Sequence, residues 1–422
     1  MPEHDGRTPT ALRAGCCICG GGPGGMMLGF LLARAGVNVL VLEKHGDFLR
    51  DFRGDTIHPS TLELMHELGL LAEFLERPHQ EARQVTGFVG GVEVTVADFT
   101  RLPTHCKFLA FMPQWDFLNF LAERGRRYPT FHIRMQAEVT SLIEENGHVV
   151  GLQATTADGP LEVRADLVVG ADGRHSTVRA QTGLKVKDLG APIDVLWMRL
   201  SRRGSDPHQP LGRFNRGKVL VMLDRDDYWQ CAFVIPKGGI DAIRRRGLPA
   251  FRDDLVEIAP FLRDRVDELN DWIDIKLLTV LIDRLEKWYQ PGLLCIGDAA
   301  HAMSPIGGVG INLAIQDAVA AANILAGPLR TGRARPSHLR QVQRRRELPT
   351  RLTQRLQIFI QDRLLSRVLA SRKQFALPWL LRLVRRWPFL RRIPAWLIGI
   401  GFRPEHVRTP DVFGVSADKE KQ

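Results

Sequence analysis

Three glycines near the N-terminus have the spacing of a phosphate-binding turn. Gly20, Gly22 and Gly25 form the pattern Gly-x-Gly-x-x-Gly between an apolar segment, residues 15–20, and a run that reads as a helix. In such a turn the first glycine allows a tight bend, the second lets the backbone approach a pyrophosphate, and the third lets helix and strand pack closely. The N-terminus of the helix then stabilises the phosphate charge. The sequence therefore predicts that a dinucleotide, either FAD or NAD, binds at this turn.

A second apolar segment, residues 36–43, supports the same prediction. It ends in Glu43, 23 residues after Gly20. A carboxylate at the end of the second strand of such a unit can accept a hydrogen bond from a ribose 2′-OH. Lys44 follows directly, and we include it in the predicted site. Strand, helix, second strand and acid together predict a Rossmann-type βαβ unit.

Two later segments each read as an apolar strand that ends in an aspartate. Asp172 and Gly173 follow one such strand, and Gly297 and Asp298 follow the other. Ligands of doubly wound folds lie at the carboxyl ends of the strands, so both segments are candidates for the cofactor site. Both aspartates could equally be turn or N-cap residues, which is a common use of this residue type.

The segment after Asp298 favours the ligand interpretation there. Pro305 precedes a run of glycines, and a helix opens at Gly310, Ile311 and Asn312. The first backbone N–H groups of a helix have no partner within the helix. Such groups are predicted to surround an anionic or electron-rich ring.

In this order and spacing, the three segments resemble the class A flavin-dependent monooxygenases, the family of para-hydroxybenzoate hydroxylase and the ubiquinone-pathway hydroxylases. The resemblance implies that FAD is the cofactor. The glycine turn with Glu43 matches the family's adenosine site. Asp172 and Gly173 match the DG motif, which contacts FAD and NAD(P)H, and Gly297 and Asp298 match the GD motif, whose aspartate binds the ribityl chain.

Further positions follow from the same resemblance, which covers about residues 13–325. Pro305 corresponds to the proline beside the flavin ring. The turn at 310–312 corresponds to the helix N-terminus whose N–H groups support the flavin N1/O2 edge. Arg53 and Gln114 correspond to side chains that also contact the cofactor.

The activity that the resemblance implies is hydroxylation of an aromatic or polyketide- or quinone-like small molecule. NADH or NADPH would reduce FAD as a transient co-substrate, because the sequence holds only one Rossmann fingerprint. O2 would then form a C4a-hydroperoxyflavin that transfers one oxygen atom to the substrate. The cofactor carries this chemistry, and the protein has to exclude water and position the substrate.

Other functions remain open from the sequence. A reductase or dehydrogenase, a halogenase, or a membrane-associated flavoprotein without monooxygenase turnover could use the same scaffold. Halogenases carry Gly-x-Gly-Glu-Ser-Thr where this chain has Arg53-Gly-Asp-Thr-Ile-His-Pro59. They carry Trp-x-Trp-x-Ile-Pro where it has Cys231-Ala-Phe-Val-Ile-Pro236. Both departures count against halogenation.

No catalytic acid or base is assigned. Tyr128 is expected to be exposed in an Arg-Arg-Tyr-Pro turn, and Tyr228 and Tyr289 are more typical of interface anchors than of catalysts. His58 is expected nearest to the flavin, although a hydrogen bond within its own loop would explain it equally well. His301 could be an N-cap partner or a functional group.

Six cysteines are scattered among apolar neighbours. Cys16, Cys17 and Cys19 lie in a predicted buried strand without a second Cys/His pair, so no metal site is predicted. Thiols of this kind fit a reducing cytoplasm.

These motifs predict an α/β fold. Residues 13–75, 105–180 and 285–330 form a Rossmann-like FAD-binding domain. Residues 76–104 and 181–284 form an inserted, mostly antiparallel β-sheet substrate domain that covers the isoalloxazine ring. The alternating apolar pattern of its strands is typical of a half-buried sheet.

The remaining region, 331–410, is predicted to be a basic, aromatic-rich helical tail. Residues 330–403 hold 19 Lys/Arg and two acids, an excess larger than the net charge of +11 for the whole chain. Between 375 and 403 arginines alternate with apolar runs, each below the roughly 20 residues that span a bilayer. We expect these segments to pack on the body, with peripheral contact to anionic lipid as the alternative. No nucleic-acid motif is present, and the sequence does not predict the oligomeric state.

Overall fold

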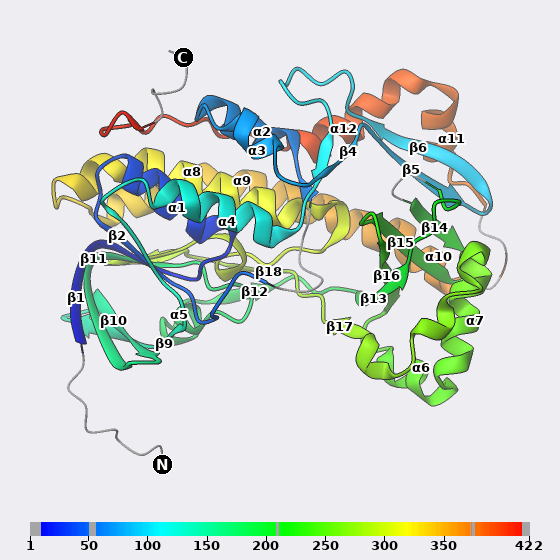
Figure 1. Ribbon diagram of the computed structural model, residues 1–422, viewed down its shortest axis with the longest axis horizontal. Coiled ribbons are helices and arrows are strands. Elements are labelled where there is room, and N and C mark those ends of the chain that lie inside the picture. The colour runs from blue at the N-terminus through cyan, green and yellow to red at the C-terminus, as the bar shows by residue number, and fades with distance from the viewer. Residues whose placement is uncertain (1–9, 50–55, 208–210, 372, 374–375, 416–422) are drawn as a thin grey trace.

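The computed structural model shows two large sheets joined by long helices (Figure 1). It describes residues 10–49, 56–207, 211–371, 373 and 376–415.

The larger sheet has eight strands, and its centre is parallel. β1 (Thr10–Cys19) lies between β2 (Val39–Leu42) and β11 (Gly159–Gly170), and the order continues to β8 (Phe131–Arg134) beyond β2 and to β20 (Leu293–Cys295) beyond β11. Because these strands are parallel, their carboxyl ends meet at one edge. The glycine turn and both aspartate motifs therefore begin at the same edge.

Antiparallel strands extend this sheet. β10 (His148–Thr156) pairs with β11 and with β9 (Ala137–Glu145), and β19 (Tyr289–Gln290) is an edge strand beside β20. Two small sheets accompany it: β3 (Thr56–Ile57), β7 (Leu109–Phe111) and β4 (Gln80–Ala82) form one, and β12 (Val186–Asp188) and β18 (Asp283–Leu285) form the other.

Four helices cover this body in a layer (Figure 1): α1 (Pro23–Arg34), α4 (Gln114–Gly125), α8 (Val309–Arg330) and α9 (Pro336–Ile360). Shorter helices connect the remaining elements: α2 (Pro59–Glu67), α3 (Leu71–Leu75), α5 (Thr177–Gln181), η4 (Gly297–Ala299) and η5 (Ile306–Gly308).

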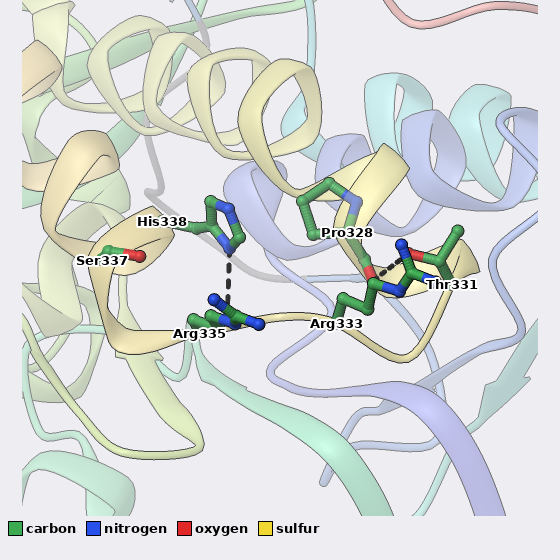
Figure 2. A pocket seen from close by; sticks show the side chains of 6 residues that line it. All are labelled: Pro328, Thr331, Arg333, Arg335, Ser337 and His338. Atoms are coloured by element: carbon green, nitrogen blue, oxygen red, sulfur yellow. Dashed lines mark hydrogen bonds between the residues drawn. The ribbon is translucent and has the colours of Figure 1, made fainter.

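Helix α8 is a core helix. Among the described residues, only the segment Ile306–Arg330 is long and apolar enough to cross a membrane, and 61% of its apolar window is buried within the protein. The turn from α8 into α9 carries a surface hollow of about 350 Å³ (Figure 2), lined by Pro328, Thr331, Arg333, Arg335, Ser337 and His338. This hollow lies at the opposite end of α8 from the glycine run, roughly 30 Å away at 1.5 Å per residue.

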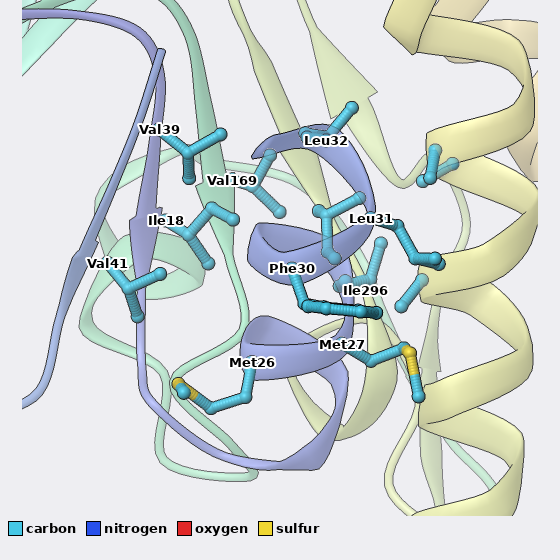
Figure 3. Close-up of a cluster of buried hydrophobic side chains, with 14 of the residues drawn as sticks. Ile18, Met26, Met27, Phe30, Leu31, Leu32, Val39, Val41, Val169 and Ile296 are labelled. Atoms are coloured by element: carbon cyan, nitrogen blue, oxygen red, sulfur yellow. The ribbon is translucent and has the colours of Figure 1, made fainter. Parts of the chain in front are cut away.

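The main core lies between α1, the sheet and α8. Every residue of α1 from Gly24 to Ala33 is buried, and its side chains fill the space between the layers (Figure 3). The labelled members of this cluster are Ile18, Met26, Met27, Phe30, Leu31, Leu32, Val39, Val41, Val169 and Ile296. The paired residues 16–19 of β1 and 39–42 of β2 are all buried, which is typical of a parallel sheet covered by helices.

The second sheet has seven strands and is antiparallel except at one pair. Its order is β17 (Lys276–Leu278), β13 (Ile193–Ser201), β16 (Tyr228–Pro236), β15 (Lys218–Asp224), β14 (Leu211–Asn215), β5 (Gln84–Val89) and β6 (Val92–Asp98). β14 and β5 are the parallel pair. Helices α6 (Ile240–Arg246) and α7 (Leu248–Ile258) and the short turns η1 (Pro260–Leu262), η2 (Val266–Glu268) and η3 (Trp272–Asp274) complete this body.

The C-terminal helices connect and cover both bodies. α9 packs along α8 and continues through η6 (Gln361–Leu365) into α10 (Ser366–Ala370), which reaches β15 and β16. α11 (Trp379–Arg386), η7 (Pro388–Arg391) and α12 (Arg392–Gly399) then pack on β6. The predicted fold class, an α/β body with an antiparallel sheet and a C-terminal helical region, is confirmed.

Candidate cofactor and active site

The glycine turn leaves one approach open. Gly20 has φ +103°, and a Cβ there would lie 2.5 Å from the carbonyl oxygen of Ala171. A Cβ at Gly25 would lie 2.0 Å from the carbonyl oxygen of Gly20, so only glycine allows helix and strand to pack this closely. A Cβ at Gly22 would have nothing within 4 Å. Gly22 caps α1, so the open space faces the helix N-terminus, where an anion is stabilised.

Glu43 fastens this turn to the end of β2. Its carboxylate is buried, with Oε2 accepting a hydrogen bond from the N–H of Gly21 at 2.9 Å and Oε1 accepting one from the N–H of His45 at 3.0 Å. Lys44, the next residue, is exposed. The structure thus places Glu43 beside the glycine turn, as the spacing predicts, and turns Lys44 towards solvent.

Asp172 organises the loop after β11. Its Oδ1 accepts a hydrogen bond from the Ser176 hydroxyl at 2.6 Å, and its Oδ2 accepts one from the N–H of Val178 at 3.1 Å. Burial raises the pKa of Asp172, although these hydrogen bonds oppose the shift. Both carboxylate oxygens of Asp172 thus accept hydrogen bonds within its own loop, as expected of a turn or N-cap residue. Gly173, with φ +84°, has open space where a Cβ would stand.

The loop after β20 lies next to the Asp172 loop. Gly170 at the end of β11 pairs in register with Cys295 at the end of β20. Gly297 adopts φ +56° and donates its N–H to Oδ2 of Asp317 at 3.1 Å. Asp298 follows it in η4 and is half-buried. The two aspartate motifs are therefore neighbours at one edge of the sheet.

The glycine run before α8 produces an abrupt helix start. Pro305 caps η5, and Gly307 and Gly308 adopt φ +78° and φ +62° before α8 begins at Val309. A Cβ at Gly310 would meet only Cβ of Met303, at 4.0 Å. The first turn of α8 is therefore approachable, and its leading N–H groups lack intrahelical partners.

The starts of α1 and α8 are side by side. A Cβ at Gly24 would lie 3.2 Å from the carbonyl oxygen of Ala314, and one at Gly297 would lie 3.0 Å from Cβ of Ala314. The glycine turn, the Gly297 loop and the first turns of α8 therefore form one continuous edge. Two helix N-termini with open approaches fit a long ligand with a pyrophosphate at one end and an electron-rich ring at the other.

Asn312 uses its side chain for structure. Oδ1 accepts hydrogen bonds from the N–H of His58 at 2.9 Å and the hydroxyl of Thr61 at 2.7 Å, and Nδ2 donates to the carbonyl of Thr56 at 2.9 Å. Asn312 thus holds the segment 56–61 against the start of α8. Arg53, predicted to contact the cofactor from just before this segment, lies outside the described residues.

His58 is buried between the glycine run and the C-terminal tail. Its side chain is 1% exposed and lies against the backbone of Ile398 and Gly307, with no hydrogen bond of good geometry at Nε2 among the described residues. Burial lowers the pKa of His58 to about 4, although the two backbone contacts oppose this shift. The ring is therefore neutral at neutral pH, and its backbone, not its side chain, makes the hydrogen bond to Asn312.

Gln114 is the first residue of α4 and is half-buried. Its side chain makes no hydrogen bond to another described residue. Among the described residues, no hydrogen bond of the Gln114 side chain therefore joins it to the glycine turn or to the Asp298 loop.

A buried ionic network supports the Gly297 loop, and the sequence did not predict it. Asp317 of α8 accepts from Nε2 of His301 at 2.5 Å and from Nε of Arg346 at 2.9 Å, besides the N–H of Gly297. Arg346 also contacts Glu405. Burial raises the pKa of Asp317, but His301 and Arg346 outweigh this and hold it below its ordinary value. His301 is thus a structural partner of Asp317.

Buried glutamines of α9 bind the backbone of residues 283–306, and Gln361 of η6 donates to the hydroxyl of Ser304. Gln357 accepts from the N–H of Ser304 at 3.2 Å and donates to the carbonyls of Ser304 and Ile306 at 2.9 and 3.0 Å. Gln354 donates to the carbonyls of Asp283 and Ala302 at 2.7 and 3.1 Å. We call these side chains, with Gln343 and Gln361, the glutamine ladder. It fixes the loop that carries Pro305.

Two expectations, on Tyr128 and on the cysteines, have clear outcomes. Tyr128 is 3% exposed and donates to Asp411 at 3.1 Å, so the predicted exposure is wrong; the C-terminal segment covers the turn. All six cysteines are buried free thiols, and burial raises the pKa of Cys17 to about 12. No group of three His, Cys, Asp or Glu side chains within the described ranges could hold a metal ion.

Comparison with known proteins identifies the family of this chain. Residues 13–355 match the family model described as an FAD binding domain. The chain is 35% identical over 352 residues to 6-methylpretetramide 4-monooxygenase from Streptomyces rimosus, which covers 83% of this chain and 84% of that protein. It is 31% identical over 306 residues to rifampicin monooxygenase from Streptomyces venezuelae, covering 71% of this chain and 61% of that protein.

The solved structure of PqsL from Pseudomonas aeruginosa in complex with 2-aminobenzoylacetate has the same fold. It superimposes with a TM-score of 0.73 at 21% identity and covers 85% of this chain and 98% of that one. The family match extends over most of the chain, and the two Streptomyces relatives are monooxygenases. This chain belongs to the class A flavin-dependent monooxygenases, which bind FAD through the FAD binding domain.

Proposed function

We propose that this protein hydroxylates an aromatic or polyketide-like small molecule, using FAD, O2 and NADH or NADPH. The observation that carries the proposal is the single edge at which the glycine turn, the Asp298 loop and the start of α8 meet. The similarity to 6-methylpretetramide 4-monooxygenase supports the substrate class.

The residues along this edge would hold FAD. The open N-terminus of α1 at Gly22 would receive the pyrophosphate, and the carboxylate of Glu43 would lie at the ribose end. Asp298 would bind the ribityl chain. Gly310 and Ile311 would present their N–H groups to the flavin ring, with Pro305 beside it. Asp172 would act by ordering the loop that ends in the open Gly173.

Bound FAD supplies the redox chemistry, in which reduction by NAD(P)H allows O2 to be activated. The chain's own residues position the ring and keep the site dry. The glutamine ladder fixes the Pro305 loop, and Asn312 fixes the segment 56–61 beside it. Ile306 also packs against the apolar cluster of the seven-stranded sheet, so this loop joins the two bodies. A rigid, water-poor site of this kind favours oxygen transfer over side reactions.

NAD(P)H would bind transiently. The chain has one glycine fingerprint, and in our proposal FAD occupies it. Gly173 leaves open space at the surface beside that edge, which supports the proposed contact between the DG motif and NAD(P)H.

We infer a cytoplasmic enzyme. Its six buried free thiols are compatible with a reducing compartment.

An anaerobic rapid-mixing experiment tests the proposal. The purified yellow protein is reduced with NADH or NADPH and then mixed with O2 in the presence of phenols and polyketides. A transient flavin absorbance before reoxidation, together with incorporation of 18O from O2 into an aromatic product, is the expected result. Direct reoxidation that no aromatic compound accelerates would contradict it and indicate a reductase or dehydrogenase.

A further inference from the structure

The C-terminal tail carries an unusual concentration of exposed apolar side chains. Seven of the sixteen large hydrophobic side chains that are exposed among the described residues lie between residues 379 and 396. Trp379 is 74% exposed, Ile393 58% and Phe389 57%. We call these seven residues the tail surface; they are Trp379, Leu380, Leu383, Trp387, Phe389, Ile393 and Trp396. Exposed apolar patches of this kind mark interaction sites.

The tail surface is the outer side of helices whose inner side is already packed. Val384 of α11 is buried, and Ala395 and Gly399 of α12 are buried where these helices meet β6. A Cβ at Gly399 would lie 2.8 Å from Leu102 and 3.2 Å from Pro59, so α12 lies directly on the body. The packing that we expected from the sequence therefore exists, but it leaves the larger apolar side chains outside.

Arginines border the tail surface. Arg382, Arg385, Arg386 and Arg392 are exposed, and none of them lies within 4.0 Å of a carboxylate among the described residues. The chain has no acidic residue between 363 and 404 but has ten Lys/Arg there. The surface thus combines exposed aromatic rings with unpaired positive charge.

The exposed aromatic rings and unpaired arginines favour a lipid surface over a second copy of the chain as the partner. A second copy of the chain on a two-fold axis would bring the same arginines face to face without acidic partners, and like charges in contact oppose association. An anionic lipid surface matches both features, because tryptophan and leucine enter the headgroup boundary while arginines attract acidic headgroups. We propose that α11, η7 and α12 dock the enzyme peripherally on a membrane that contains anionic lipid.

Docking in this orientation would bring the site near the membrane. Ile398 of α12 lies against His58, whose N–H binds Asn312 at the start of α8. One helix therefore separates the tail surface from the proposed flavin end of the site.

Sedimentation of the full-length holoenzyme with vesicles tests the proposal. Vesicles of phosphatidylcholine with phosphatidylglycerol are expected to bind it, binding should weaken as salt rises, and pure phosphatidylcholine should bind it less. The triple variant Arg382→Glu/Arg385→Glu/Arg386→Glu should partition roughly a hundredfold less, at about fivefold for each removed arginine. The matched control Arg244→Glu/Arg245→Glu changes exposed arginines of α6 and should bind as the wild type does.

Tryptophan fluorescence gives a second readout that needs no charge change. Three of the eight tryptophans belong to the tail surface. Brominated lipid should quench the wild type, and the variant Trp379→Phe/Trp387→Phe/Trp396→Phe should lose most of that quenching. Absence of binding to acidic vesicles, or equal binding by the triple arginine variant and the wild type, would overturn the proposal. A lipid-free dimer that Trp379→Ser dissociates, without vesicle binding, would overturn it in favour of a contact between copies.

Discussion

A helix on a globular protein usually buries its apolar side chains and exposes its polar ones. Two helical regions of this protein depart from that rule in opposite directions. α9 turns polar and charged side chains inward: Arg346 is 1% exposed, and Gln354 is fully buried. α11 and α12 turn tryptophans and other large apolar groups outward. Both departures from the rule have a physical reason that lies in what each helix faces.

The inward polar face of α9 meets backbone that regular structure satisfies only in part. Residues 283–306 run through short strands, η4 and the approach to η5, so their N–H and C=O groups need partners when buried. The glutamine ladder supplies them. The outward face of α11 meets nothing in the described chain, which leaves its apolar side chains for a partner outside the protein. Polar residues are thus buried where a loop must be held, and apolar residues are exposed where we propose lipid binding.

Removal of Arg346 is expected to have the largest effect. Arg346→Met removes the buried guanidinium that Asp317 and Glu405 share, and leaves Asp317 with His301 and Glu405 with Arg345. Breaking a buried ion pair in this way costs about 3–5 kcal/mol. FAD should also dissociate faster, because Asp317 holds the N–H of Gly297. Denaturant unfolding and flavin release measure both effects. The control Arg351→Met breaks an exposed ion pair on the same helix and should cost less than about 1 kcal/mol. Equal losses of stability in the two variants would contradict the stabilising role of the buried ion pairs of α9.

The pH dependence of stability probes the buried contact between the tail and α8. His58 has a pKa of about 4 in the fold and about 6.5 when unfolded, so the unfolded chain binds the additional proton between these values. The stability that the neutral His58 ring contributes is fully present above about pH 6.5 and is lost as the pH falls through 4. The total loss in the free energy of unfolding is on the order of 3 kcal/mol. Thermal unfolding of the wild type and His58→Asn over this range should show a shallower pH dependence for the variant. The same pH dependence in the wild type and in His58→Asn would show that a residue other than His58 causes it.

Truncation of one ladder residue should have an intermediate effect. Gln357→Leu leaves the N–H of Ser304 and the carbonyl of Ile306 without their partner, at a cost of about 1–3 kcal/mol. The loop carrying Pro305 should loosen, which flavin fluorescence of the holoenzyme would report. Arg355→Leu, at an exposed position two residues earlier on α9, is the comparison and should leave both measurements unchanged.

The smallest change in stability is expected from the tail surface. Trp379→Ser replaces a side chain that is 74% exposed, so the free energy of unfolding should change by within about 0.5 kcal/mol. Val384→Asp, on the inner side of the same helix, should destabilise the packing on β6 and shift the melting temperature. If Trp379→Ser were as destabilising as Val384→Asp, the outer face would be a packing face in the folded protein.

Much of the candidate site could be proposed from the sequence because its signals are local. The glycine turn can be recognised within six residues, because each glycine is required by the local backbone. An aspartate that directly follows a strand lies at the edge of the sheet. The roles of Asn312 and His301 could not be predicted in this way, since their partners are 254 and 16 residues distant along the chain. The Tyr128 prediction failed for the same reason: Asp411, far away in sequence, covers it.

The sequence alone therefore determined the βαβ unit, the order of the three motifs, the family and the basic character of the tail. Only the tertiary structure decided which face of each C-terminal helix is buried. The spacing of residues along a helix shows that it has a polar and an apolar side, but the free energy of each side depends on what packs against it. In α9 that neighbour is loop backbone that requires hydrogen-bond partners, and in α11 the apolar face has no protein neighbour within the described residues.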